Sequence, residues 1–226
     1  RIDAVTDLAQ AFPLRVFPDA VGIGREGREH LLPYGNLAFN AFGPRNALLE
    51  EALAQAGPAG DWIASQCRRE ALAPDGFGAQ IYGAADAGEI PPGEAGMLVR
   101  SLLTAGVDTT VHGLGNALYC FAGHPGQWRR LHEAPALASA AFDEVLRHES
   151  PVQTFFRTST RELAVDGTRI GAGEKVLLFL GAANRDPRAF TAPDDFDIGR
   201  RSAGHVAFGS GIHMCVGQML AKLEAE

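Results

Sequence analysis

The longest stretch of apolar periodicity, residues 94–122, constrains the fold of this chain more than any other feature. It follows Pro91-Pro92 and is stopped by Gly123-His124-Pro125. A helix of this length is unusual in a globular protein and predicts an element that crosses the whole core. The chain has 226 residues, of which 46% are hydrophobic, so one domain can bury such a helix.

Shorter elements surround this segment. Helical spacing predicts helices over residues 31–42, 46–56, 62–72, 135–148 and 218–224. Residues 73–93 are rich in Gly, Ala and Pro and predict a loop region with room for one short helix. After Ser150-Pro151 the period changes and predicts strands over residues 152–158, 162–165, 168–170 and 175–180, with a hairpin turn at Asp166-Gly167. The fold class is therefore mainly α with a small β portion.

Charge and cysteine usage exclude several functions. A formal net charge of −7 and the lack of any basic run argue against nucleic-acid binding. Cys67, Cys120 and Cys215 are widely spaced, so they indicate neither a disulfide framework nor a zinc site and are typical of a reducing cytoplasm. The apolar runs are too short to span a bilayer, so we expect a cytoplasmic protein without a membrane segment.

Near the C-terminus, one cysteine lies in a glycine-rich loop just before an amphipathic helical run. The loop reads Phe208-Gly209-Ser210-Gly211-Ile212-His213-Met214-Cys215-Val216-Gly217. A helix N-terminus favours a thiolate, and a thiolate is a strong axial donor to haem iron. The alternative is an ordinary turn with a buried cysteine acting as a small hydrophobe. Phe, Gly, Cys and Gly at these four offsets should occur by chance in on the order of one chain in a thousand.

Two further motifs are weaker when taken alone. Asp108-Thr109-Thr110 lies inside the long helical segment although these residues are poor helix formers, and such conflicts are often kept at functional sites. The alternative is a threonine that bonds back to a carbonyl, with Asp108 paired locally. Glu144 and Arg147 share a helix face, where an exposed pair contributes only a few tenths of a kcal/mol.

The cysteine loop resembles the haem-ligand loop of the cytochrome P-450 family in its bacterial form. Asp-Thr-Thr, Glu-x-x-Arg and Asn184-Arg185-Asp186-Pro187 resemble family motifs and occur in the same order. The resemblance implies a partial P-450 fold that holds one haem b between the long distal helix and the cysteine loop. It also implies a single haem-binding domain over residues 1–226 that is truncated at both ends, because family members are nearly twice as long.

Roles for individual residues follow from this resemblance. Cys215 would be the axial ligand, Thr109 would hydrogen-bond the iron-bound peroxo group, and Asp108 would relay protons. Residues that would contact the haem are Gly106, Arg157, Phe208, Gly209, His213 and Gly217. Glu144 and Arg147 would form a structural pair. Asp195 stands where many members carry the third, basic partner, so we expect Arg200 to take that role.

The implied activity is that of a haem-thiolate monooxygenase, which uses O2 and electrons from an iron–sulfur ferredoxin with an NAD(P)H-dependent reductase. Nearly the whole chain resembles bacterial enzymes that demethylate 4-methoxybenzoate, which implies a small aromatic acid as substrate and a monomeric protein. The expected substrate-binding residues are Phe39, Phe42, Ser101, Thr104, Ala105, Val152 and Phe155. Arg129, Arg130 and Lys222 could face an acidic redox partner. The alternatives are oxidation of another small hydrophobic substrate, a haem-binding sensor or carrier, and a remnant that binds no haem.

Overall fold

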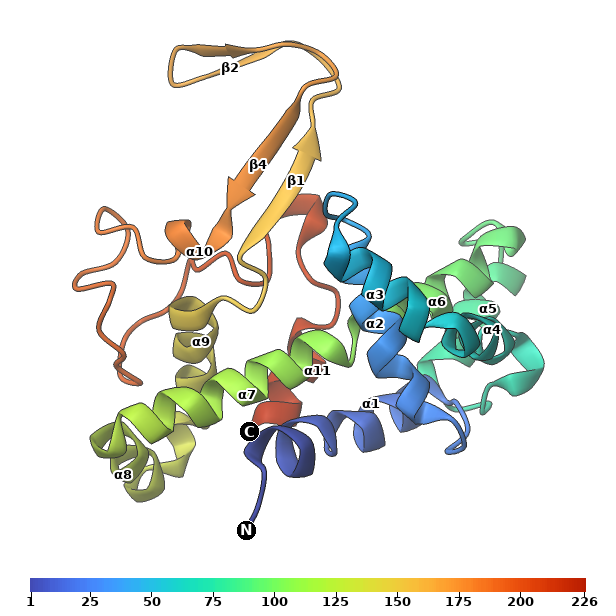
Figure 1. The fold of residues 1–226 in the computed structure, drawn as a ribbon, viewed down its shortest axis with the longest axis horizontal. Coiled ribbons are helices and arrows are strands. Elements are labelled where there is room, and N and C mark those ends of the chain that lie inside the picture. Colours follow the sequence, from blue (N-terminus) through green and yellow to red (C-terminus); the bar gives the residue numbers. More distant parts are fainter. The chain divides into compact units, whose positions relative to one another are not determined.

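Helices account for most of the chain, and its four strands are short (Figure 1). The computed structural model describes residues 1–226 and divides them into two compact units, residues 1–115 and 116–226. The predicted class, mainly α with a small β portion, is confirmed. The first unit contains α1 (Pro13–Val21), α2 (Leu31–Asn40), α3 (Ala47–Gln55), α4 (Gly57–Gln66), α5 (Phe77–Asp86), α6 (Ala95–Ala105) and the beginning of α7 (Asp108–Gly123).

Helix α6 forms the centre of the first unit because one of its faces is apolar at helical spacing. Ala95, Val99 and Leu103 recur every fourth residue and are almost completely buried. Helices α1, α2, α4 and α5 all contact α6. On α2, the hydroxyl of Tyr34 accepts a hydrogen bond from Nε of Arg100 at 2.5 Å, and the guanidinium lies over the tyrosine ring. The apolar face of α6 therefore organises the first unit.

The predicted single long helix is wrong in one respect, since α6 ends at Ala105 and α7 begins at Asp108. At this break the hydroxyl of Thr109 donates to the Ala105 carbonyl at 2.8 Å, and that of Thr110 donates to the Gly106 carbonyl at 3.2 Å. Hydroxyls that bond to carbonyls four residues back bend helices. The two threonines, which are poor helix formers, thus lie where the helix is interrupted.

Two helices begin elsewhere than predicted because of proline, and α4 also ends earlier, at Gln66 instead of at residue 72. Helix α4 begins at Gly57, earlier than predicted, and α8 (Pro125–Glu133) begins where the sequence indicated only a stop. Both helices carry proline in their first two positions, where its missing N–H costs no hydrogen bond and its φ angle is already helical. A proline that ends one helix can therefore also begin the next.

The second unit is built on the end of α7, on α8, and on α9 (Ala138–Glu149). Its apolar core consists of Cys120, Ala141, Val145, Phe196 and Ile198. The C-terminal helix α11 (Gln218–Ala225) packs against α9. Within α11, Glu224 is buried without a hydrogen-bond partner, and burial raises the pKa of this carboxyl group to about 7.

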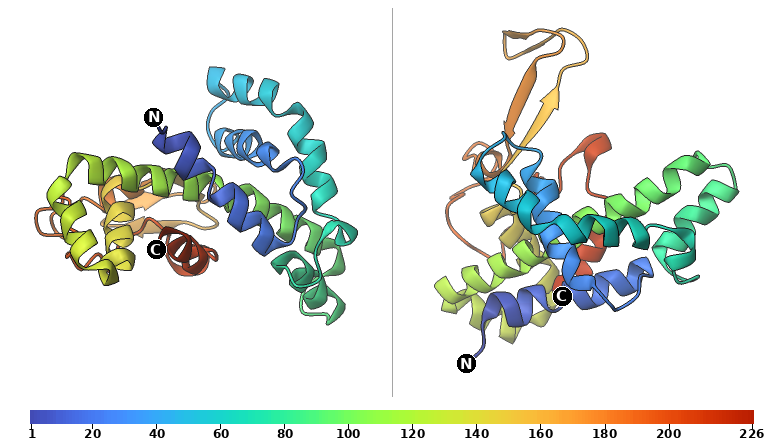
Figure 2. Two further views of the ribbon diagram at one scale, coloured as in Figure 1. Left: turned by 90° about the horizontal axis from the view of Figure 1, so that it is seen from below. Right: turned by 45° about the vertical axis from the view of Figure 1, so that its right-hand side comes forward.

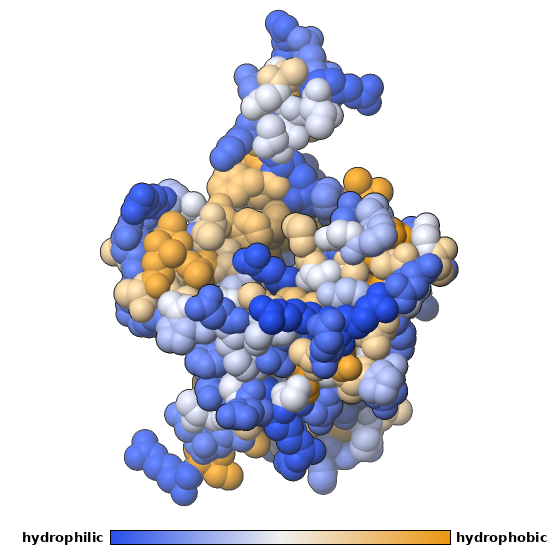
Figure 3. Space-filling view, turned by 90° about the vertical axis from the view of Figure 1, so that its right-hand side faces the viewer, coloured by the Kyte–Doolittle hydropathy of each residue, from blue (hydrophilic) through white to orange (hydrophobic).

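The predicted strands form two antiparallel hairpins. Strand β1 (Thr154–Thr158) pairs with β4 (Lys175–Phe179), and β2 (Leu163–Val165) pairs with β3 (Thr168–Ile170) at the outer end of the longer hairpin (Figure 2). Asp166 and Gly167 both have positive φ, as the predicted two-residue turn requires. The outer end is mainly hydrophilic (Figure 3). A one-turn helix, α10 (Leu180–Ala183), follows β4.

Candidate functional site

Cys215 lies between a 3₁₀ turn, Gly211–His213, and the first turn of α11. Its backbone N–H donates to the carbonyl of Phe208 at 2.8 Å, which closes the loop. Of the three free cysteines, Cys67 and Cys120 are buried and Cys215 is exposed. The structure therefore presents the Cys215 side chain to a ligand, whereas packing accounts for the other two.

Two glycines of this loop are required by its backbone. Gly209 and Gly211 have φ angles of +75° and +64°, in the left-handed region that favours glycine. A Cβ atom on Gly209 would lie only 2.9 Å from the carbonyl oxygen of His213. Gly217 has an ordinary φ of −85°. The positions of Gly209 and Gly211 thus follow from the loop conformation, and a haem contact of Gly209 or Gly217 stays a prediction.

Exposed apolar residues flank Cys215 in the chain and form an apolar rim of the loop. Ile212 is 98% exposed, Val216 89% and Met214 51%. Uncovered apolar side chains beside one another usually mark a surface that a ligand or partner covers. A haem is a flat, largely apolar macrocycle with a central iron. An exposed sulfur can bind the iron, and an apolar rim can contact the macrocycle. These residues therefore fit a haem, and His213 is also exposed, in the 3₁₀ turn of the same loop.

The base of the loop is held to α9 by a charged cluster. Nζ of Lys222 lies 2.8 Å from Oδ1 of Asp143, and Nε2 of His205 lies 3.4 Å from the same oxygen. The ring of Phe208 lies 5.9 Å from both the His205 ring and the Lys222 ammonium. Although burial acts to raise it, the bonds from His205 and Lys222 hold the pKa of the Asp143 carboxyl below its usual value. The cluster fixes the side of the loop that carries Phe208.

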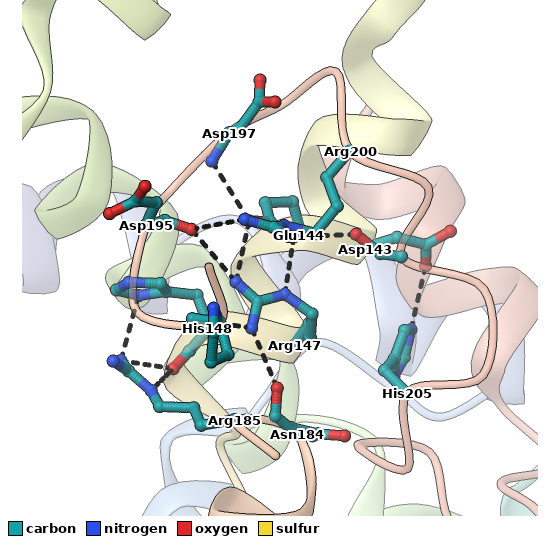
Figure 4. A network of polar contacts seen from close by, with 12 residues as sticks. Asp143, Glu144, Arg147, His148, Asn184, Arg185, Asp195, Asp197, Arg200 and His205 are labelled. Carbon is teal, nitrogen blue, oxygen red and sulfur yellow. Dashed lines mark hydrogen bonds and ion pairs between the residues drawn. The ribbon is translucent and has the colours of Figure 1, made fainter. Parts of the chain in front are cut away.

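The predicted structural pair forms the most buried polar network (Figure 4). Glu144 and Arg147 are both completely buried and bond through both carboxylate oxygens, at 2.8 and 2.9 Å. Nε of Arg200 donates to Glu144 at 3.0 Å, and the hydroxyl of Ser202 donates to it at 2.8 Å. Burial acts to raise the pKa of Glu144, but these hydrogen bonds and one from the Asp197 N–H hold it below its usual value. The structure thus brings Glu144, Arg147 and Arg200 together.

Asp195 takes part in this network through its backbone. Its carbonyl accepts from Nη2 of Arg147 at 3.2 Å and from Nη2 of Arg200 at 3.1 Å. The third, basic partner of the pair, expected to be Arg200, is therefore supplied five residues after Asp195. Asn184 joins the network to the segment just before the cysteine loop, since its carbonyl accepts from Arg147 at 2.9 Å and its Oδ1 accepts from the N–H of Val206 at 2.7 Å.

In the first unit, Asp108 follows the break between α6 and α7. A Cβ atom on Gly35 of α2 would lie 3.2 Å from its Cβ atom, so α2 approaches Asp108 closely. Nε2 of His112, one turn further along α7, lies 3.6 Å from Oδ1 of Asp108. The neighbouring Asp108 carboxylate raises the pKa of His112. Sequence reasoning missed His112, although its spacing of four residues from Asp108 was a usable signal.

Gly106 lies against an aromatic ring of its own unit. A Cβ atom at this position would lie 2.0 Å from the ring of Phe17 on α1, so any side chain would displace that helix. Packing of α1 thus accounts for the glycine. The predicted haem contact of Gly106 stays a prediction.

The expected substrate-binding residues occur in both units. In the first unit, the rings of Phe39 and Phe42 meet edge to face at 6.2 Å, and Ala105 ends α6 as an exposed residue. The hydroxyls of Ser101 and Thr104 donate to the carbonyls of Met97 and Arg100 at 2.9 and 2.8 Å.

In the second unit, half-buried Val152 precedes β1, which carries Phe155 and Arg157. The Arg157 guanidinium lies 5.4 Å above the Phe155 ring, and its Nη1 donates to the Phe156 carbonyl at 2.8 Å. A haem contact of Arg157 and a shared pocket for the substrate residues stay predictions.

Comparison with known proteins identifies the family. Residues 83–226 match the model of the cytochrome P450 family. The chain belongs to the cytochrome P450 family. Its bacterial relative cytochrome p450 CYP199A2 from Rhodopseudomonas palustris is 58% identical over 225 residues, which cover 100% of this chain and 55% of the relative. The chain thus spans about half the length of the curated relatives it matches.

Solved P450 structures share this fold. Cytochrome P450 CREJ in complex with (4-ethylphenyl) dihydrogen phosphate matches with a TM-score of 0.89 and 32% identity over 99% of this chain and 57% of its own. P450BioI in complex with an acyl carrier protein ligated to hexadec-9Z-enoic acid matches with a TM-score of 0.86 and 33% identity, over 99% and 59%. Haem b is the cofactor of this family. No helix of the chain is both long and apolar enough to cross a membrane.

Proposed function

We propose that the protein is a haem-thiolate monooxygenase in which Cys215 binds the iron. The observation that carries this proposal is the exposed Cys215 side chain within an apolar rim, held by a glycine-shaped loop directly before α11. Haem, when bound, supplies the activation of O2 and the transfer of one oxygen atom to a C–H bond. The protein supplies the sulfur ligand, the protons and the placement of the substrate.

Asp108 and Thr109 are the proposed proton-handling groups. The Thr109 hydroxyl is held by the Ala105 carbonyl at 2.8 Å, so its oxygen keeps lone pairs with which it can accept another hydrogen bond. The carboxylate of Asp108 lies next to His112, which is 60% exposed and can exchange protons with water. Protons can thus pass from solvent through His112 to Asp108, a route that a haem carrier would not need.

Thr109→Ala in the full-length enzyme is expected to leave the substrate-induced spectral shift nearly unchanged while diverting electrons to hydrogen peroxide. Asp108→Asn is expected to slow turnover after oxygen binding, because the amide cannot relay a proton. Thr110→Ala is the matched control, since it removes the same kind of hydroxyl-to-carbonyl bond at the same break. Measured peroxide per NAD(P)H consumed should rise for Thr109→Ala alone. Loss of substrate binding with unchanged coupling would contradict the proton role.

A para-substituted aromatic acid, with oxidative O-demethylation of a methoxybenzoate, is the proposed substrate and reaction. The edge-to-face pair Phe39–Phe42 offers apolar surface for a ring, and the similar protein CREJ binds a para-substituted phenyl phosphate. Ser101 and Thr104 are the proposed carboxylate donors. Each hydroxyl has one proton, which now bonds a helix carbonyl, so either group must rotate to bind a carboxylate.

Titration with 4-methoxybenzoate and with its neutral analogue 4-methoxytoluene tests this substrate class. The acid should bind the full-length enzyme more tightly, because a buried carboxylate with donors contributes roughly 1.5–3 kcal/mol per hydrogen bond. Ser101→Ala should weaken binding of the acid about tenfold and leave the neutral analogue nearly unaffected. Haem spectra report both affinities. Equal affinity of the two ligands for the parent enzyme would remove the aromatic-acid proposal and leave the monooxygenase proposal intact.

An iron–sulfur ferredoxin with its NAD(P)H-dependent reductase is the proposed electron donor. Of the three basic residues expected to face it, Arg130 pairs with Asp197 at 2.7 Å and Lys222 with Asp143 at 2.8 Å. Only Arg129 has no ion-pair partner within the chain. These three residues therefore attract an acidic partner less strongly than the sequence indicated, because two of their charges are already paired.

A further inference from the structure

Three potential metal ligands from α7 and α9 converge in the second unit, apart from the cysteine loop. They are Cys120, His148 and Glu149, and one ligand atom of each lies within 4.8 Å of the other two. Sulfur, imidazole nitrogen and carboxylate oxygen are the three donor types that zinc accepts in proteins. Donors around a tetrahedral zinc ion lie about 3.5 Å apart, so small side-chain movements would complete the site.

Hydrogen bonds select one tautomer of the neutral His148 ring. Its Nε2 lies 3.1 Å from the carbonyl oxygen of Asp194, which can only accept, so Nε2 carries a proton. Its Nδ1 lies 3.2 Å from Nη2 of Arg185, which can only donate, so in the neutral ring Nδ1 presents a lone pair (Figure 4). Yet Nδ1 is also 2.7 Å from Oε1 of Glu149. Two lone pairs this close repel each other unless a cation, a metal ion or a proton, lies between them.

Cys120, which also belongs to the apolar core of this unit, adds a soft donor. Its side chain is 2% exposed, and its thiol makes no hydrogen bond. The three residues also line a cavity of about 400 Å³, and His148 and Glu149 line a second cavity of about 310 Å³. The first cavity gives access from solvent and leaves room for a water molecule as fourth ligand, as in zinc sites with three protein ligands.

Arg185 is the only cation beside the cluster, and its charge does not oppose zinc binding. A thiolate and a carboxylate neutralise Zn²⁺, so the guanidinium would face a group without net charge. Arg185 is anchored independently, because its Nε and Nη2 donate to the His148 carbonyl at 3.0 and 2.7 Å and its Nη1 donates to Asp194 at 3.1 Å. Its contact with Nδ1 of His148 and its ion pair with Oε1 of Glu149, at 3.6 Å, have to be given up.

We propose that Cys120, His148 and Glu149 form a zinc site that is separate from the haem iron and joins the C-terminal ends of α7 and α9. The bond from Nε2 of His148 to Asp194 orients the imidazole, as second-shell carbonyls do in known metal sites. Binding releases the Cys120 thiol proton to solvent, and the metal replaces Arg185 as the partner of Nδ1 of His148 and of Oε1 of Glu149. The cysteine spacing gave no indication of this site because only one of its ligands is a cysteine.

The test uses the full-length, haem-loaded protein dialysed against micromolar zinc, with bound metal counted by mass spectrometry. We expect one zinc per chain, and X-ray absorption at the zinc edge should show one sulfur at about 2.3 Å and nitrogen or oxygen ligands at about 2.0–2.1 Å. The same measurement on Cys215→Ser separates this site from the haem ligand. Zinc bound through one sulfur in that variant supports the new site whether or not Cys215 binds iron.

Two ligand variants and one control decide the assignment. Cys120→Ser should lose the sulfur signal and bind zinc roughly tenfold or more weakly, and Glu149→Gln should keep the sulfur but lose affinity. Cys67→Ser removes the other buried cysteine and should behave like the parent protein. The proposal is overturned by a parent protein without bound zinc, by zinc without a sulfur ligand, or by full zinc affinity in both ligand variants. A proton between His148 and Glu149 would then be the shared cation.

Discussion

Cys215→Ser in the full-length enzyme is expected to abolish the red-shifted Soret band of the reduced, CO-bound protein and to reduce monooxygenase turnover below detection. A serine hydroxyl has almost the same size but is a far weaker donor to iron, and it provides no electron push for O–O cleavage. The loop itself should survive, because it is held by the N–H of residue 215 and by the glycines at 209 and 211, which the substitution leaves in place.

Cys67→Ser is the matched control for this experiment. Cys67 is 8% exposed at the end of α4, and burial raises the pKa of its thiol, which disfavours the thiolate form. Its replacement should leave the thiolate band unchanged. A thiolate band that persists in Cys215→Ser would place the iron ligand elsewhere in the chain.

The elements with strong local signals were predictable from the sequence. The Asp166-Gly167 turn, the paired strands, and the helices α2, α3, α9 and α11 depend on turn chemistry or on regular apolar spacing, and the structure has them close to the predicted bounds. The cysteine loop was equally readable, because its glycine positions are set by the backbone of the loop itself.

Features that depend on long-range contacts were not predictable in the same way. The burial of Glu144 and Arg147 requires carbonyl groups from residues 184 to 195, whose approach no local pattern reveals. Glu224 reads as part of the polar face of an amphipathic helix but is buried. The break in the long helix depends on which carbonyl each threonine hydroxyl selects. Such choices are made by tertiary packing, which overrides local preference.

The largest effect on stability is expected from the network around Glu144. Arg147→Met removes a buried guanidinium that donates to both carboxylate oxygens and to the carbonyls of Asn184, Pro193 and Asp195. Breaking a buried ion pair by removing one partner typically lowers the free energy of unfolding by about 3–5 kcal/mol. The free energy of unfolding of a whole protein is only about 5–15 kcal/mol, so yields of haem-containing protein should also fall.

Glu144→Leu should destabilise the protein more than Arg147→Met does. The carboxylate is shared by two arginines, since Arg147 is completely buried and Arg200 is only 13% exposed. After Arg147→Met, Glu144 keeps Arg200 and Ser202 as partners, whereas Glu144→Leu leaves the buried Arg147 and the partly buried Arg200 without a counter-charge.

Adding Arg147→Met to Glu144→Leu removes one of these cations, so the double variant should be more stable than Glu144→Leu alone, a non-additivity typical of residues in one network. Urea unfolding followed by circular dichroism measures the stability of all three variants.

Arg69→Met is the control. Arg69 bonds Asp86 at 2.8 and 2.6 Å in an exposed pair, so its replacement should change the free energy of unfolding little. If Arg147→Met lowered the unfolding midpoint no more than Arg69→Met, the network would not hold the fold together. If the double variant were the least stable, counter-charge would not be what Glu144 supplies.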